Sequence, residues 1–143
     1  MHDNIRPAQA DDIALLCDLD RLIFGANAYN EEQWVTELGN SARQIFLAAQ
    51  NRGFITVQSS GDDHEIIKIG VLPEYRRQGI ARKLIQQSTD AAKRCLIDVA
   101  ADNRAALQFY QALGFREIAR RRKYYANGSD AVIMEKAAPH SGA

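Results

Sequence analysis

One segment in the middle of the chain combines basic side chains with a glycine, at a point where a strand should give way to a helix. It runs Val71-Leu72-Pro73-Glu74-Tyr75-Arg76-Arg77-Gln78-Gly79-Ile80-Ala81-Arg82. A helix that begins here presents unpaired backbone N–H groups and the positive end of its dipole, which together suit a pyrophosphate. Gly79 lets the backbone approach a ligand closely, and the arginines add fixed positive charge. The alternative is an exposed basic turn before a surface helix.

The spacing of this loop excludes two common nucleotide-binding motifs. A Walker loop continues with Gly-Lys-Ser/Thr, which is absent here, and a dinucleotide fingerprint needs more glycines than Gly79 alone. The pattern Arg76-x-x-Gly79-x-Ala81 instead resembles the acyl-CoA loop, Gln/Arg-x-x-Gly-x-Gly/Ala, of the Gcn5-related N-acetyltransferase (GNAT) superfamily. Acyl transfer from a thioester is therefore the leading hypothesis for its chemistry.

The resemblance to this superfamily extends over roughly residues 5 to 136, with the segments in the right order. Residues 102–115, Asp-Asn-Arg-Ala-Ala-Leu-Gln-Phe-Tyr-Gln-Ala-Leu-Gly-Phe, resemble its Asn-x-x-Ala-x-x-x-Tyr-x-x-x-Gly-Phe segment. Other segments resemble the bacterial ribosomal-protein alanine N-acetyltransferase (RimI-type) branch: Gly53-Phe54-Ile55, Glu65-Ile66-Ile67, Arg121-Arg122-Lys123-Tyr124-Tyr125 and Asp130-Ala131-Val132-Ile133-Met134.

The resemblance implies an α/β fold made of one GNAT-like domain, residues 1–136, followed by a disordered tail, residues 137–143. Its sheet would be mixed and mostly antiparallel, with a splayed central strand pair and helices on both faces. Acetyl-CoA would be the acyl donor, its pyrophosphate on the loop amides and its pantetheine beside the strand that precedes the loop. The implied cofactor-binding residues are Ile69, Val71, Arg76, Arg77, Gln78, Gly79, Ile80, Ala81, Arg82, Asn103 and Tyr110.

Acetyl transfer to an amine needs a base for the amine and a proton for the departing thiolate. The resemblance makes Tyr110 the candidate acid, because a phenol with a pKa of about 10 is protonated at neutral pH. Asp98 and Glu65 compete as the base. Asp98 lies among apolar neighbours in an expected strand, but the RimI-type branch has a glutamate there, so a water relay is expected. Glu65 is equally well explained as a solvated strand-end carboxylate. Tyr110 alone could be a half-buried helix aromatic, but the spacing from Asn103 to Gly114 favours the functional role.

Four aromatic residues are candidates for the acceptor side of the site, although each could simply pack in the core: Tyr29, Trp34, Tyr124 and Tyr125. The acceptor amine limits how much basicity is needed. An α-amine with a pKa of about 8 is neutral in roughly a fifth of molecules near pH 7.4, whereas a lysine is neutral in about one in a thousand. A weak carboxylate base therefore suits a protein N-terminus better than a lysine.

These residues favour an acetyl-CoA-dependent N-acetyltransferase that acts on a protein N-terminal α-amine. Two alternatives remain open: a small-amine acetyltransferase (polyamine, amino acid or aminoglycoside) on the same scaffold, and a non-catalytic acyl-CoA-binding sensor domain. The last hairpin of the chain could also mediate a homodimer.

Composition excludes several other functions. The chain has 143 residues, with 18 Lys plus Arg against 18 Asp plus Glu, and this balance disfavours nucleic-acid binding. Its basic cluster, Arg116 and Arg120 to Lys123, is more typical of a solvated strand edge. No apolar run approaches the roughly 18 residues of a membrane span, and Met1-His2-Asp3-Asn4 does not begin a signal peptide.

Cysteine and histidine usage adds two expectations. Cys17 and Cys95 both lie in apolar stretches and are interpreted as buried free thiols of a cytoplasmic protein. The histidines, His2, His64 and His140, lack metal-ligand spacing, so no metal site is expected.

Periodicity predicts the strands and helices that must position these groups. Strands are expected at 5–8, 44–49, 54–58, 65–72, 96–100, 115–124 and 130–135, with a polar turn at 59–63. A first helix follows Asp11-Asp12, with a stripe of Ile13, Leu16, Leu19 and Ile23. A second runs from about Asn30 to Gly39, with Trp34, Val35 and Leu38 inside. A third follows Gly79, with Ala81, Leu84, Ile85, Ser88 and Ala92 on one face. A fourth covers 104–113, capped by Asp102 or Asn103 and closed by Gly114.

Overall fold

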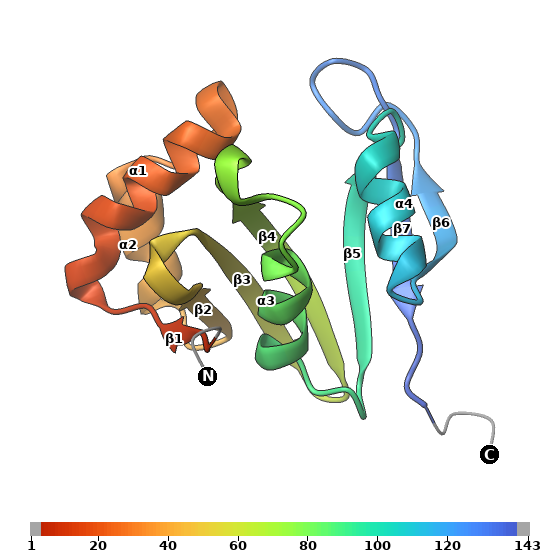
Figure 1. The fold of residues 1–143 in the computed structure, drawn as a ribbon. Helices are drawn as coiled ribbons and strands as arrows, with labels where there is room; N and C mark the ends of the chain where they lie inside the picture. Colours follow the sequence, from red (N-terminus) through yellow and green to blue (C-terminus); the bar gives the residue numbers. More distant parts are fainter. Residues whose placement is uncertain (1–3, 140–143) are drawn as a thin grey trace.

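The computed structural model describes residues 4–139, within which a seven-stranded sheet carries helices on both faces (Figure 1). The strands are β1 (Arg6–Pro7), β2 (Arg43–Leu47), β3 (Gly53–Ser60), β4 (Asp63–Val71), β5 (Arg94–Ala100), β6 (Arg116–Arg121) and β7 (Ala131–Lys136). The α-helices are α1 (Ile13–Phe24), α2 (Glu31–Gly39), α3 (Ile80–Ser88) and α4 (Arg104–Ala112). Of the predicted tail, residues 140–143 lie outside the described residues.

The order of the strands is β1-β2-β3-β4-β5-β7-β6. Among the pairs in this described sheet, β4 and β5 are parallel and the others are antiparallel. The predicted mixed, mostly antiparallel sheet is thus confirmed, and β4 lies at its centre as its apolar sequence indicates.

Alternation along β3 divides its side chains between two cores. Phe54 packs on one face with Leu16 of α1 and Trp34 of α2. Ile55 points to the other face, where it belongs to the core that contains Tyr110 of α4 and the inner side of α3. Helices therefore cover both faces, as the resemblance implies. Over the described residues, no helix combines the length and apolar character that crossing a membrane requires.

The second helix begins as predicted but buries fewer residues. The Asn30 side chain accepts a hydrogen bond of 2.8 Å from the Gln33 N–H, which caps α2. Trp34 is fully buried, whereas Val35 is 51% exposed. The prediction of Val35 on the inner face was wrong, because the next residue of a helix is turned about 100° away and this short helix buries only a narrow stripe.

Three element boundaries also differ from the prediction. Helix α3 ends at Ser88, because Asp90 accepts a bond of 2.9 Å from the Ala92 N–H and so forms a turn; Ala92 is not on the helix. The turn expected at 59–63 is shorter, since β3 and β4 extend to Ser60 and Asp63. Strand β6 ends at Arg121, and residues 122–130 form a long loop.

The central strands β4 and β5 separate after a short paired region. Their register runs from Asp63 opposite Arg94 only as far as Ile66 opposite Ile97. At the same point β4 has a bulge, because Val57 of β3 pairs with Ile66 and Thr56 with Lys68, which leaves Ile67 without a partner in the register. A bulge bends its strand and increases the local twist. The implied splay of the central pair is therefore confirmed, and Figure 1 shows the two strands diverging.

Candidate active site

The basic loop connects β4 to α3 and presents a helix N-terminus without a side-chain cap. Gly79 precedes the helix with a φ of +81°, and Arg77 has a φ of +64°. No side chain caps α3, whereas Asn30 caps α2 and Asn103 caps α4. The first N–H groups of α3, which lack partners within a helix, are therefore available to a ligand. Left-handed residues followed by a positive helix end form a concave anion site.

Basic side chains around this loop have different roles. Arg76 points back, and its Nε donates a hydrogen bond of 3.1 Å to the Val71 carbonyl, so it fixes the loop to the end of β4. Arg77 and Arg82 are exposed. Arg52, from the β2–β3 connection, lies 4.5 Å above the Tyr75 ring and supports the loop from behind. The predicted cluster therefore includes one residue that shapes the loop and others that are free to face an anion.

The end of β4 leads directly into the loop. Ile69 is half-buried and Val71 is buried, and both follow the point at which β4 leaves β5. Beyond Ile66 the β4 backbone keeps its bonds to β3, but its other edge does not pair with β5. An open strand edge can accept an extended ligand by backbone hydrogen bonding, as expected for the pantetheine arm.

Tyr110 lies on the inner side of α4. It is 5% exposed, and its ring packs against Phe109 and Phe115 with centroids 5.1 and 5.5 Å apart. Burial raises the pKa of the phenol, and the nearby Cys95 thiol adds to this effect. Tyr110 therefore keeps its proton at neutral pH, which a proton donor requires.

The two candidate carboxylates share the opposite face of the sheet. Side chains alternate along β5, so Asp98 lies on the same face as Leu96 and opposite to Ile97, which is in the Tyr110 core. Glu65 pairs with Leu96 in the parallel register and shares that face. We call this side, which carries Glu65 and Asp98, the carboxylate face. Acid and base candidates thus lie on opposite faces of the sheet, with Asp98 directly after the last paired residue of β5 and Glu65 within the paired region.

Tyr125 lies within the electrostatic influence of Asp98. Burial raises the pKa of the Tyr125 phenol, and the Asp98 charge raises it further. Tyr125 is half-buried, whereas Tyr124 is 51% exposed and lies beneath the Arg121 guanidinium, 5.4 Å from its ring centroid. Of the two predicted tyrosines, Tyr125 is thus partly buried and feels the Asp98 charge, and Tyr124 is turned toward the surface.

Asn103 has a local role that decides between the two predicted caps. Its Oδ1 accepts a hydrogen bond of 3.1 Å from the Ala106 N–H, so Asn103, and not Asp102, caps α4. Its amide NH₂ group is not used in this cap. That group stays the candidate contact for a bound cofactor, at the point where β5 gives way to α4.

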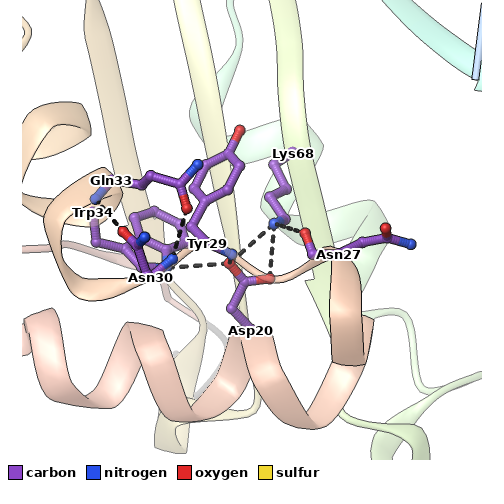
Figure 2. Close-up of polar contacts among 7 residues, drawn as sticks. All are labelled: Asp20, Asn27, Tyr29, Asn30, Gln33, Trp34 and Lys68. Carbon is purple, nitrogen blue, oxygen red and sulfur yellow. Dashed lines mark hydrogen bonds and ion pairs between the residues drawn. The ribbon is translucent and has the colours of Figure 1, made fainter. Parts of the chain in front are cut away.

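Tyr29 and Trp34 belong to a buried polar cluster (Figure 2). Trp34 has no exposed surface, so its predicted alternative as a core residue is the one observed, and it does not face an acceptor. Its Nε1 donates a bond of 3.1 Å to Asp20, and the Tyr29 backbone N–H donates one of 2.9 Å to the same carboxylate. Lys68 of β4 completes the cluster, with its ammonium 3.8 Å from the Tyr29 ring centroid. Tyr29 is half-buried.

Comparison with known proteins places this arrangement in a family. Residues 20–138 match the acetyltransferase (GNAT) domain family. This chain belongs to the GNAT family. It is 38% identical over 99 residues to N-alpha-acetyltransferase 30 of Schizosaccharomyces pombe, covering 60% of this chain and 66% of that protein. It is 38% identical over 77 residues to the N-alpha-acetyltransferase RimI of Mycobacterium tuberculosis, covering 52% of this chain and 49% of that protein. The chain thus spans about half to two thirds of the length of these curated relatives.

A solved structure matches this GNAT domain over nearly its whole length. The ribosomal-protein-S18-alanine N-acetyltransferase from Escherichia coli superposes with a TM-score of 0.83 at 25% identity, covering 99% of this chain and 98% of that one. The overall fold is therefore shared from end to end.

Sequence reasoning missed two residues of the GNAT domain that the structure brings together. Asp20 lies in the apolar stripe of α1 and is fully buried, and Lys68 interrupts the apolar run of β4. A charged residue at a core position signals a buried partner. Each position gave that signal, but the pairing of two residues far apart in the chain was visible only in the fold.

Proposed function

We propose that this GNAT domain is an acetyl-CoA-dependent N-acetyltransferase whose acceptor is a protein N-terminal α-amine. The observation that carries the proposal is the position of acid and base candidates on opposite faces of the diverging strands. An amine can approach from the carboxylate face while a leaving group departs toward Tyr110. The likeness over 99% of this chain to the ribosomal-protein-S18-alanine N-acetyltransferase of Escherichia coli supports a protein acceptor. The similarity to two N-alpha-acetyltransferases supports an α-amine.

The residues present fit acetyl-CoA. The uncapped start of α3 and the exposed Arg77 and Arg82 suit its pyrophosphate, and the unpaired edge of β4 at Ile69 and Val71 suits its pantetheine arm. When bound, acetyl-CoA supplies the activated acetyl group. We assign to this contact surface the backbone from Gln78 to Arg82, together with the Asn103 amide.

The chain's own groups then handle protons. Asp98 accepts a proton from the acceptor ammonium, directly or through a water. A water relay fits because the Asp98 side chain is one methylene shorter than a glutamate and ends nearer the sheet. Glu65 is the alternative base on the same face. Tyr110 holds a phenolic proton on the other face, available to the departing thiolate. Tyr125, which feels the Asp98 charge, and Tyr29 are assigned to acceptor binding.

We place this activity in the cytoplasm, in keeping with the free thiols of Cys17 and Cys95. Protein N-termini are presented there in quantity. No nucleic-acid contact is part of the proposal, because Arg116 and Arg120 of the basic cluster are engaged by Glu135 and Glu117.

The test compares three acceptors with the purified protein and acetyl-CoA. They are a short peptide with a free N-terminal alanine, the same peptide blocked at its N-terminus but carrying a lysine, and spermidine. We expect the free α-amine to give the highest kcat/KM, with mass spectrometry locating the acetyl group on the N-terminus. Faster turnover of spermidine would favour a small-amine enzyme. Heat stabilisation by acetyl-CoA without turnover of any amine would favour a sensor domain.

A further inference from the structure

The buried ion pair between Asp20 and Lys68 is linked to the carboxylate face by strand register. Thr56 of β3 pairs with Lys68 and Gln58 pairs with Glu65, so Lys68 and Glu65 project from the same side of β4 despite the bulge between them. Lys68 therefore lies on the diverging part of β4, on the face to which the proposed function brings the acceptor.

The pair joins three separate segments of the chain. Lys68 Nζ lies 2.8 Å from Asp20 Oδ1 and 3.0 Å from Oδ2. The same ammonium lies 3.4 Å from the Asn27 carbonyl oxygen, with the Tyr29 and Phe24 ring centroids at 3.8 and 4.8 Å. Asp20 also accepts the Tyr29 N–H. This pair thus links the connection between α1 and α2, residues 25–30, to β4 (Figure 2).

The burial of the pair indicates that its main contribution is to fix the positions of neighbouring groups and not to add net stability. The Asp20 side chain is 0% exposed and the Lys68 side chain is 10% exposed. Two buried charges gain little net stability, and well-packed apolar residues often replace such pairs without loss. Apolar residues, however, cannot accept hydrogen bonds, whereas the Asp20 carboxylate accepts both the Tyr29 N–H and the Trp34 indole N–H. The pair therefore specifies where residues 25–30 lie.

We propose that Asp20 and Lys68 are positioning residues for the acceptor: they hold Tyr29 and the α1–α2 connection against the diverging end of β4 and thereby select the chains that reach Asp98. This inference rests on the proposed function. The paired charges leave no net charge at this position, so the acceptor ammonium is drawn to Asp98 and Glu65 without opposition from Lys68. The pair acts on the acceptor and not on the donor, since the phosphate loop lies on the α3 side of the sheet.

The test measures KM and kcat for both substrates in Lys68→Met, Lys68→Arg and Asp20→Asn/Lys68→Met variants. For Lys68→Met we expect the KM of the peptide acceptor to rise about tenfold or more, with the KM of acetyl-CoA within about twofold of the wild type. The double variant, which buries no unpaired charge, should show the same split. Lys68→Arg keeps an ion-pairing group and should recover most of the acceptor affinity.

Arg6→Met is the matched control, because it removes the ion pair of 2.9 Å that ties β1 to Asp12, the residue directly before α1. It should leave both KM values unchanged. A purely structural role for Lys68 would lower kcat through loss of folded protein and leave KM unaltered, which would overturn the inference.

Hydrogen exchange of residues 25–30 gives a readout besides activity and should accelerate in Lys68→Met but not in Arg6→Met. If the wild type acetylates no α-amine, the proposed function itself is wrong. If the wild type is active but the KM of the acceptor is unchanged in both Lys68→Met and Asp20→Asn/Lys68→Met, only this inference is wrong.

Discussion

Arg94 of β5 donates two hydrogen bonds, of 3.1 and 2.9 Å, to Asp63 of β4, at the end where these parallel strands are paired. The same guanidinium bonds Glu135 of β7 at 2.9 Å, so one side chain joins three adjacent strands. These contacts lie at the end opposite to the divergence of β4 and β5. Because β4 and β5 are unpaired at one end of the sheet, side-chain bonds at the paired end help to hold the two strands together.

We predict that Arg94→Met lowers the melting temperature by a few degrees and leaves the KM of acetyl-CoA close to the wild-type value. The Arg94 guanidinium holds the pKa of the Asp63 carboxyl below its usual range. This contribution to stability is present above the unfolded pKa of about 3.9 and is lost as the pH falls through the lower folded value. The difference between the melting curves of wild type and variant should therefore shrink in strong acid. A difference that grows as the pH falls would contradict this account.

The acid assignment predicts that Tyr110→Phe lowers kcat by about a hundredfold while the KM of the peptide stays nearly constant. Phenylalanine keeps the packing against Phe109 and Phe115 and removes only the hydroxyl, so the fold and the heat stabilisation by acetyl-CoA should persist. Steady-state kinetics with both substrates, beside a thermal shift assay, make the comparison. Equal rates for variant and wild type would remove Tyr110 from the mechanism.

Much of the fold follows from local signals in the sequence. Asn30 and Asn103 are strong helix caps, and Gly79 occupies a left-handed backbone position that other residues rarely adopt. Alternating apolar residues located the central strands. Boundaries that depend on one side-chain bond, such as the end of α3 at Ser88 before the Asp90 turn, were not predictable from periodicity.

The site was less predictable, because its geometry depends on pairing. The divergence of β4 and β5 was implied by resemblance alone; its cause, the bulge at Ile67, is a property of strand register. The placement of Asp98 and Tyr110 on opposite faces likewise requires the fold. Trp34 resembled a possible acceptor contact in sequence, but its indole N–H bonds a buried carboxylate 14 residues away.

The competition between the two carboxylates predicts different outcomes for Asp98→Asn and Glu65→Gln. Asp98 follows the last paired residue of β5, where this strand leaves β4, whereas Glu65 lies in the paired region. We predict that Asp98→Asn lowers kcat/KM for the peptide by about a hundredfold and that Glu65→Gln lowers it about tenfold or less. The reverse order would make Glu65 the base.

The pH profile checks the same assignment from another side. If Asp98 accepts the amine proton, raising the pH should partly rescue Asp98→Asn, because the α-amine deprotonates on its own near a pKa of about 8. Glu65→Gln should follow the wild-type profile. A rescue confined to Glu65→Gln would again reverse the roles.

A buried histidine predicts how stability depends on pH. His64 on β4 is 6% exposed; its Nδ1 lies 3.1 Å from Ser59 Oγ, and within the described residues its Nε2 is buried without a hydrogen-bond partner. Burial lowers the pKa of the imidazole, and Lys93 lowers it further, while Asp90 and Asp63 partly oppose the shift. The folded protein therefore resists protonation at His64 more than the unfolded chain does.

It follows that the free energy of unfolding should decrease as the pH falls below about 6.5, the unfolded pKa of histidine, and toward the lower folded value. We predict that His64→Gln flattens this dependence between about pH 5 and 7, where most carboxylates stay ionised. Ser59→Ala is the control, since it removes the Nδ1 contact but keeps the imidazole and should keep most of the slope. Urea unfolding at several pH values measures the effect, and parallel slopes for wild type and His64→Gln would show that another group titrates.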